Sequence, residues 1–218
     1  MQKYPNTPNR DNPADTDSNP LVNATSQIAN RAAVNPILDQ AWFKRPTAVV
    51  AADLIGCYLC RRMPDGQVLR AQITETEAYL GVGDAACHAF EGRHTPRTSV
   101  MYKEAGTIYV YLIYGLHYLL NIVTTEIGQP EAVLIRAVYL ADEPIKTGAG
   151  PAKLTKRLAI DKRLNNHLLG EDIGLWVEKK TEATVPVSVA KRVGIDYAGE
   201  AAHWLMRFYW TGHGSVSK

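Results

Sequence analysis

Residues 107–124 read TIYVYLIYGLHYLLNIVT, two runs of β-branched and aromatic residues that meet at Tyr114-Gly115. Such runs favour strands, and a glycine between them is typical of a β-hairpin. A second hairpin is indicated upstream, where a Pro-Asp-Gly turn separates CYLCRRM (57–63) from VLRAQITETEAY (68–79). The sequence therefore predicts a sheet that is mainly antiparallel.

The remaining patterns predict short elements around this sheet. They indicate a strand at EAVLIRAVYL (131–140), and late strand and loop segments at SVAKRVGI (188–195) and WLMRFYW (204–210). Helices are expected from about residue 47 to Gly56, over residues 84–90, and after the Gly/Pro loop of GAGPAKLTKRLAI (148–160). Because strands outnumber helices without a regular βαβ alternation, we expect a single α+β domain.

Length and composition limit the domain organisation. The chain has 218 residues, of which 46% are apolar, and a formal net charge of +2. That is enough chain for one full core, and its composition excludes a wholly disordered or fibrous protein. Residues 1–36 hold seven Asn and five Pro but few large apolar residues. We therefore expect a disordered tail over 1–36 and a folded domain over 37–218.

The sequence also predicts where the protein works. Three cysteines cannot build a disulfide framework, and the first residues lack the apolar stretch of a secretory signal. We therefore expect an intracellular protein of the cytoplasm or nucleoid. Residues 105–125 carry no charge over a length that could span a bilayer, but Tyr, His, Asn and Gly interrupt them. No membrane association is expected.

Acidic residues gather at the end of one predicted strand. Glu75, Glu77 and Tyr79 share one parity, so an unbroken strand would place them on one face. A solvated strand face is the alternative, since charged side chains mostly stay exposed. Arg136 interrupts the apolar run AVLI-R-AV, where an arginine needs a carboxylate or a ligand as partner. Together these residues indicate a site rather than a plain surface.

The tyrosines of the 107–124 hairpin are a second candidate group. Tyr109 and Tyr111 share one strand face, where packing in the core and a ligand platform are both open. Tyr114 has the other parity and lies at the hairpin tip. An exposed aromatic tip is harder to explain by packing, and it could enter a stack of nucleic-acid bases.

Two further groups could bind a metal ion, but their spacing argues against it. Cys57 and Cys60 have a zinc-like spacing, yet residues three apart on a strand face opposite sides. Small core side chains are the alternative. Asp84, His88 and His94 could form a hydrolytic metal site, but they lack the helical His pair of the stronger signature. Hydrogen-bonded or stacking histidines are the alternative there.

A short segment is locally basic. It carries five basic residues against Asp161, namely Lys153, Lys156, Arg157, Lys162 and Arg163. A solvated helix face is one interpretation. A phosphate-binding segment next to the Gly/Pro loop is the other.

Several of these motifs together resemble the methylpurine (alkyladenine) DNA glycosylase family. The resemblance covers about residues 38 to 212 and rests on ITETEAYLGVGDAACHAFEGRHTPRTSVMY, GTIYVYLIYGLHYLLNIVT, EAVLIRA, GPAKLTKRLAI, RVGI and RFY, in that order. It implies a compact domain with a curved, open-barrel-like antiparallel sheet flanked by helices. It also implies monofunctional excision of alkylated or deaminated purines that are flipped out of duplex DNA, with no metal or cofactor. A monomer is the default expectation.

The resemblance assigns roles by position. Glu77 matches the general base that activates water, Arg136 the arginine that helps to hold that water, and Val193 a backbone carbonyl beside it. The base pocket is matched by Tyr79, His88, Tyr111 and Asn121, of which Asn121 disfavours the 2-amino group of guanine. Tyr114 matches the residue that fills the gap in the duplex. We expect Lys153, Lys156 and Arg157 to contact the DNA backbone.

One segment departs from the family pattern. The connection VYLADEPIKTGA (138–149) is short and lacks an LEP sequence associated with relatives, which affects DNA contacts from that side. Two other functions stay open at this point. One is a catalytically silent damaged-DNA binding module on the same scaffold, and the other is a metal hydrolase that uses Asp84, His88 and His94.

Overall fold

The computed structural model describes residues 35–182 and 184–217. The predicted disordered tail lies outside the described residues, apart from Asn35 and Pro36. Residues 35–218 form one compact unit.

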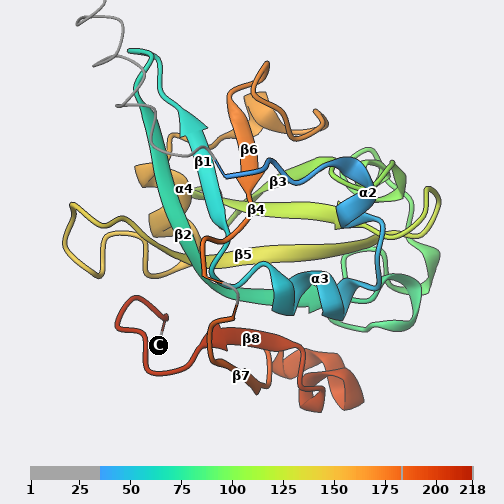
Figure 1. The fold of residues 1–218 in the computed structure, drawn as a ribbon. Coiled ribbons are helices and arrows are strands. Elements are labelled where there is room, and N and C mark those ends of the chain that lie inside the picture. The colour runs from blue at the N-terminus through green and yellow to red at the C-terminus, as the bar shows by residue number, and fades with distance from the viewer. Residues whose placement is uncertain (1–34, 183, 218) are drawn as a thin grey trace, which may run out of the picture. The chain divides into compact units, whose positions relative to one another are not determined.

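Eight strands form the centre of this unit (Figure 1). They are β1 (Tyr58–Arg62), β2 (Val68–Tyr79), β3 (Ile108–Ile113), β4 (His117–Thr124), β5 (Glu131–Tyr139), β6 (Leu175–Glu178), β7 (Val187–Ala190) and β8 (Arg207–Trp210). The helices are α2 (Gln40–Phe43), α3 (Thr47–Asp53) and α4 (Pro151–Arg157). Five 3-10 segments complete the described elements, at Gly81–Gly83, Phe90–Gly92, Ser99–Tyr102, Lys162–Leu164 and Asp196–His203.

All the strand pairs are antiparallel, and β2 takes part in three of them, with β1, β5 and β8. The main order is β3-β4-β5-β2-β1-β6, and β8 pairs with both β2 and β7. Figure 1 shows that the sheet curls, so that β1, β2 and β6 run across the direction of β3, β4 and β5. The predicted α+β fold with a curved antiparallel sheet is confirmed, including both hairpins.

The long strand β2 is irregular at Glu75. Its pairing with β5 shifts register on both sides of Glu75. A bulge bends a strand and changes where its side chains point. Beyond it, residues 74–78 are buried on both faces of the strand. The Thr76 hydroxyl donates to the Ala51 carbonyl of α3 at 2.8 Å, while Glu75 and Glu77 both contact Arg136 of β5.

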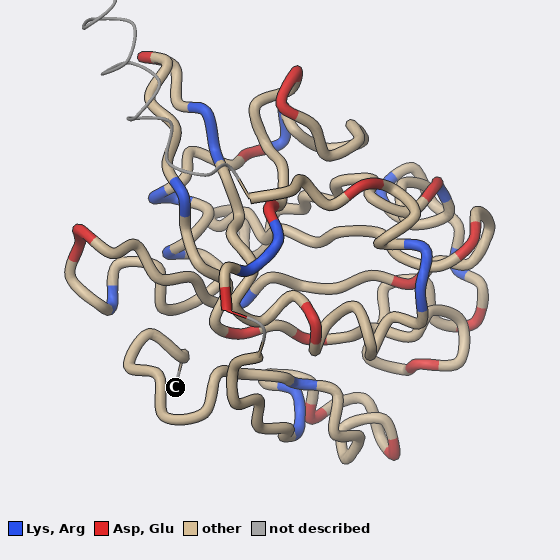
Figure 2. The backbone as a smooth tube through the Cα atoms, viewed as in Figure 1, with Lys and Arg blue, Asp and Glu red and all other residues tan. Residues whose placement is uncertain are grey.

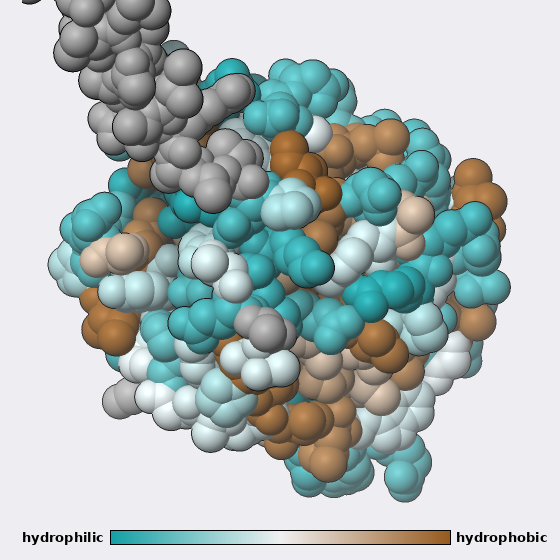
Figure 3. All heavy atoms as spheres, viewed as in Figure 1, coloured by the Kyte–Doolittle hydropathy of each residue, from teal (hydrophilic) through white to brown (hydrophobic). Residues whose placement is uncertain are grey.

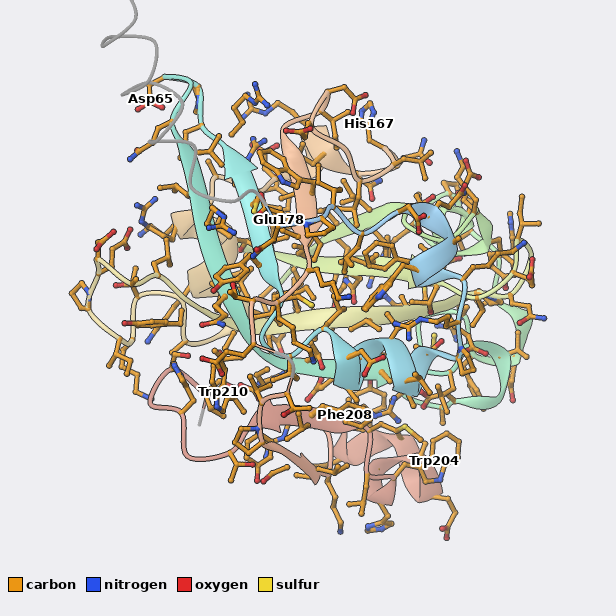
Figure 4. The ribbon with its side chains drawn as sticks, viewed as in Figure 1. Asp65, His167, Glu178, Trp204, Phe208 and Trp210 are labelled. Atoms are coloured by element: carbon orange, nitrogen blue, oxygen red, sulfur yellow. The ribbon has the colours of Figure 1, made fainter. Side chains whose placement is uncertain are left out.

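The core lies between the sheet and its helices. Helix α3 packs on β2 and β5, and α4 packs on β4 and β5. Large buried side chains include Leu54, Ile73, Ile122, Ile135 and Leu154. On the far side of β2, strand β8 adds Phe208, labelled in Figure 4. Strand β5, which carries Arg136, therefore packs against both helices and pairs with β2 and β4.

One expectation from the sequence needs correction, and two short elements were not expected. Residues 84–90 are not a helix but a series of turns between 3-10 segments. The Asp84 carboxylate accepts from the backbone N–H groups of Leu80 and Ala86, and such local bonds compete with helix formation. Strand β6 and the single turn α2 were not predicted, since four-residue elements carry little periodicity.

The surface near the C-terminal end has apolar character. Figure 3 shows brown spheres over β7 and β8, where Val187 and Val189 are exposed. These two side chains alternate with Ser188, as expected for an edge strand with one open face. None of the helices in the described ranges combines the length and apolarity needed to cross a bilayer.

Gly148 should be intolerant of a side chain. A Cβ there would lie 2.5 Å from the Val138 carbonyl oxygen, because the loop before α4 lies directly against β5. Gly148→Ala should therefore lower the free energy of unfolding by about 1–3 kcal/mol, as overpacking does. Gly83→Ala is the control, since its Cβ would meet nothing within 4 Å. Equal urea midpoints for the two variants would contradict this packing.

Candidate active site

A pocket of about 580 Å³ opens beside the β3–β4 hairpin. This volume lies in the range of about 300–1,000 Å³ that is typical of small-molecule sites. The pocket brings together parts of the chain that are far apart in sequence. Its lining includes Tyr79, His88, Arg97, Tyr109, Tyr111, Tyr114, Asn121, Arg136, Pro151, Ala152, Val193 and Tyr197.

Glu77 lies immediately behind the wall of this pocket. Its side chain has no exposed surface, and its three partners all line the pocket. The Tyr79 hydroxyl donates to Oε2 at 2.9 Å, and the Val193 backbone N–H donates to Oε1 at 2.8 Å. Arg136 Nη1 lies 3.4 Å from Oε1. These contacts hold the carboxylate in one orientation.

Burial and hydrogen bonding act on Glu77 in opposite directions. Burial raises the pKa of the carboxyl group, while Arg136, the Val193 N–H and the Tyr79 hydroxyl lower it; the net pKa is raised above the ordinary glutamate value. A carboxylate with a raised pKa is a better proton acceptor than a solvated one. Glu77 therefore has the properties of a general base.

A second carboxylate keeps Arg136 in place. Glu75 Oε1 accepts from Arg136 Nε at 3.0 Å and from Arg207 at 3.1 Å, and its Oε2 accepts from the Ser217 N–H at 2.7 Å. Burial alone would lower the pKa of Arg136, but Glu77 and Glu75 outweigh it and raise the pKa. The arginine stays charged between two carboxylates. The sequence predicts that Arg136 needs a carboxylate or a ligand as partner, and in the structure its partners are Glu75 and Glu77.

The loop at Val193 contacts Glu77 through its backbone. The Val193 N–H makes this contact, and the role of the Val193 carbonyl beside the water stays a prediction. The preceding residue, Arg192, is buried with Asp84 in an ion pair that includes an Nη2–Oδ1 contact of 2.8 Å. Arg192 also donates to the Ala78 carbonyl at 3.0 Å. This pair ties residue 193 to the end of β2, beside Glu77.

Aromatic rings form one side of the pocket. The His88 and Tyr111 ring centroids are 4.5 Å apart, and those of Tyr109 and Tyr111 are 5.4 Å apart. The Tyr109 hydroxyl lies 2.8 Å from His88 Nδ1. Burial, together with Arg97 and Arg93, lowers the pKa of His88 to about 4, so its ring is neutral at pH 7. Burial raises the pKa of Tyr79 and Tyr111.

Asn121 is buried in the wall of this site, whereas Tyr114 is exposed at its edge. Asn121 is buried on β4, and its Nδ2 donates to the Tyr109 carbonyl at 3.2 Å, which fixes the amide in the pocket wall. Tyr114 is 85% exposed at the tip of the β3–β4 hairpin, with a backbone φ of 52°. A tyrosine held in this left-handed conformation at an exposed turn is uncommon and points to a role outside packing.

Some side chains of the basic segment form ion pairs, and others in the described structure do not. Lys153 and Lys156 are exposed on α4, whose first residues line the pocket. Arg157 instead binds Glu143, with Nε at 2.8 and 2.9 Å from the two carboxylate oxygens. Arg163 similarly binds Asp161. Figure 2 shows blue and red segments alternating around the loops, so any cationic surface here is local.

The alternative metal site does not assemble. Asp84 is engaged by Arg192, His88 by Tyr109, and the His94 ring packs 4.6 Å from that of Tyr102. In residues 35–182 and 184–217, no group of three or more His, Cys, Asp or Glu side chains is arranged to hold a metal ion. Cys57 and Cys60 are both buried.

The structure adds site residues that the sequence did not single out. Arg97 and Tyr197 line the pocket, and Tyr197 is 73% exposed at its rim. Arg192 binds Asp84 and the Ala78 carbonyl at the end of β2, next to Glu77. The only local signal for them was polar or aromatic character within loops, which is common in any chain. Arg192 contacts Asp84, 108 positions away, whereas Arg97 contacts the nearer His88 and Tyr111.

Comparisons with known proteins point to one family. The family model described as methylpurine-DNA glycosylase (MPG) matches residues 41–214. A protein of Psychrobacter cryohalolentis, named "Putative 3-methyladenine DNA glycosylase", is 47% identical over 85% of this chain and 97% of its own length. Proteins with the same name from Bdellovibrio bacteriovorus and Desulfitobacterium hafniense are 43% and 40% identical, over 84% and 79% of this chain and 99% and 94% of their own lengths.

The buried pair of Arg192 and Asp84 should be important for stability. Arg192→Met would leave Asp84 buried without its counter-charge, which costs about 3–5 kcal/mol of unfolding free energy. Arg163→Met is the matched control, because its pair with Asp161 lies at the surface and should leave the urea midpoint unchanged. A small effect of Arg192→Met would show that Asp84 does not depend on this arginine.

Proposed function

Because this chain belongs to the methylpurine-DNA glycosylase family, we propose that it hydrolyses the N-glycosyl bond of alkylated or deaminated purines in duplex DNA. The observation that carries this proposal is Glu77, a buried carboxylate whose three partners line an aromatic pocket. DNA is thus the expected partner, and the product would be a free base and an abasic site.

A base inside a duplex cannot reach such a pocket. The nucleotide must be extruded, at a cost of a few kcal/mol in lost stacking and pairing. Tyr114 is suited to offset part of that cost, because its exposed ring projects from the hairpin that borders the pocket. Inserted in the gap, it would restore stacking to the remaining bases. Damaged pairs flip more easily, which favours lesions over normal bases.

The pocket residues would then bind the flipped purine. Tyr79 would face one side of the ring, and His88 and Tyr111, whose ring centroids are 4.5 Å apart, would face the other. Tyrosine faces attract cationic alkylated purines by about 0.5–2 kcal/mol each. Asn121, fixed by the Tyr109 carbonyl, would disfavour the 2-amino group of guanine. His88 is neutral and cannot repel a cationic base.

The bond cleavage would use Glu77. The carboxylate accepts a proton from water, the water oxygen bonds to the sugar C1′, and the electron pair of the C1′–N bond leaves with the base. Positive charge develops on the sugar, and the same carboxylate stabilises it. Arg136 would help to hold the water, and the Val193 backbone would orient the carboxylate. The proposed carbonyl contact of Val193 with the water stays a prediction.

The DNA backbone would lie along α4. Lys153 and Lys156 are exposed beside the pocket mouth and suit phosphate contacts. Arg157 is a weaker candidate, because Glu143 already compensates its charge. A working monomer likewise stays a prediction.

Glu77→Gln should abolish excision and leave DNA binding intact. The amide cannot accept a proton, so the single-turnover rate should fall by about 10²–10⁴-fold. The assay uses excess protein on duplexes with 7-methylguanine, ethenoadenine or hypoxanthine, followed by alkali cleavage at abasic sites. Glu178→Gln is the control, a buried carboxylate on β6 that binds Arg70 and does not line the pocket (Figure 4).

The outcomes separate the possible functions. Excision by the wild type and by Glu178→Gln, but not by Glu77→Gln, supports the proposal. Intact lesion DNA with every protein, combined with normal binding, would favour the silent binding module. Rapid excision by Glu77→Gln would remove Glu77 from the mechanism.

Tyr79→Phe should shift the acid limb of the rate profile to higher pH. The Tyr79 hydroxyl lowers the pKa of Glu77 by hydrogen bonding to its charged form, so its removal raises that pKa. Activity needs ionised Glu77 and is therefore lost at a higher pH as the solution is acidified. Tyr109→Phe is the control, since its hydroxyl bonds His88. An unmoved limb in Tyr79→Phe would contradict the assignment.

The salt dependence of binding should distinguish the basic residues. For B-DNA, each neutralised phosphate contributes about −0.9 to the slope of log K against log salt concentration. Lys153→Gln and Lys156→Gln should each reduce the slope by about one such contribution. Arg157→Gln should reduce it less, because Glu143 already neutralises that arginine. A larger reduction of the slope in Arg157→Gln than in the two lysine variants would place the phosphates along the Arg157 side of α4.

A further inference from the structure

Arg97 brings a positive charge into the pocket that the mechanism above does not use. Its guanidinium carbon lies 5.1 Å from the centre of the Tyr111 ring, and Nη2 lies 2.9 Å from His88 Nε2. In the described part of the chain, no Asp or Glu forms an ion pair with Arg97. The charge therefore stands uncompensated against two of the rings that would stack on a flipped base.

The Arg97 guanidinium lies against both nitrogens of the His88 ring. Its Nη2 is 2.9 Å from Nε2 and 3.3 Å from Nδ1 of the imidazole. The Tyr109 hydroxyl lies 2.8 Å from the same Nδ1. Together with burial, Arg97 and Arg93 lower the pKa of His88 to about 4. The cation on this wall is thus Arg97, and His88 is the neutral ring beside it.

We propose that Arg97 determines specificity by charge: it opposes the entry of purines that are already cationic and offers a hydrogen bond to neutral purines. This inference rests on the function proposed above and concerns the same pocket. A cationic alkylated purine gains from the tyrosine faces but meets the guanidinium of Arg97. A neutral purine such as hypoxanthine carries ring nitrogens and a carbonyl that accept from it.

The charge balance of the reaction shows where the effect must appear. When the C1′–N bond breaks, its electron pair stays with the base, while C1′ bonds to the water oxygen and Glu77 takes the proton. The base becomes more negative by one unit whether it starts neutral or cationic. A fixed cation therefore favours departure of both kinds of base equally. The same cation opposes the entry of cationic bases only. Discrimination between cationic and neutral bases therefore lies in binding and not in the maximal rate.

The test compares Arg97→Gln with a neighbouring charge. Arg93→Gln removes the same charge from the same loop, but Arg93 does not line the pocket. Single-turnover rates are measured against protein concentration on duplexes with 7-methylguanine, which is cationic, and hypoxanthine, which is neutral. The quantity that decides is the ratio of the two half-saturating concentrations, because any phosphate contact of Arg97 cancels in it.

Arg97→Gln should lower the half-saturating concentration for 7-methylguanine relative to hypoxanthine by about two- to fivefold, the size of interactions between partly solvated charges. It should lower both maximal rates by a similar factor. Arg97→Lys should keep a ratio close to that of the wild type, and Arg93→Gln should leave the ratio unchanged. An unchanged ratio in Arg97→Gln, or the same shift in Arg93→Gln, would overturn the inference.

A second measurement needs no DNA. In the free protein, Arg97→Gln should raise the pKa of His88 from about 4, followed by the ¹⁵N shifts of the imidazole. A smaller rise is expected in Arg93→Gln, and an unmoved pKa in Arg97→Gln would show that the contact is absent. The proposed function fails separately, if the wild type excises neither base.

Discussion

Arg136 joins Glu75 and Glu77, two buried carboxylates on one strand, and the site depends on this three-residue bridge. Charges taken out of water are costly unless they are paired and hydrogen-bonded. Glu75 meets that condition through Arg136, Arg207 and the Ser217 N–H, which come from β5, β8 and the C-terminal segment. Glu77 therefore retains its charge partner without needing exposure to solvent.

The fold explains why this bridge can form. The bulge at Glu75 bends β2, so that its second half pairs with β5 on one side and with β8 on the other. Thr76 then faces α3, while the two glutamates face Arg136. The curled sheet brings the β3–β4 hairpin and the loop at Val193 to the same side. Rigid strands thus carry the proposed base, and loops carry most of the surface that would meet DNA.

The strands were predictable because their signals are local. The alternation and turn residues of β2, β3, β4 and β5 were evident in the sequence, and so was the need of Arg136 for a carboxylate. The assignment of Glu77, Tyr111 and Asn121 to one pocket needed the family resemblance, since no local pattern brings three strands together. The turns of 84–90 were predicted wrongly, because the side chain of Asp84 outcompeted a weak helix preference.

Long-range pairs were the least predictable part. Nothing near Arg192 indicates Asp84, 108 positions away, and nothing near Arg157 indicates that Glu143 neutralises it. The central claim, that Glu77 faces the sugar of a flipped purine, is tested most directly by a crystal structure of Glu77→Gln with a duplex containing ethenoadenine. The account predicts the lesion base between Tyr79 and Tyr111, with C1′ facing residue 77 and Tyr114 in the gap. A lesion still stacked in the duplex, or bound away from residue 77, would contradict it.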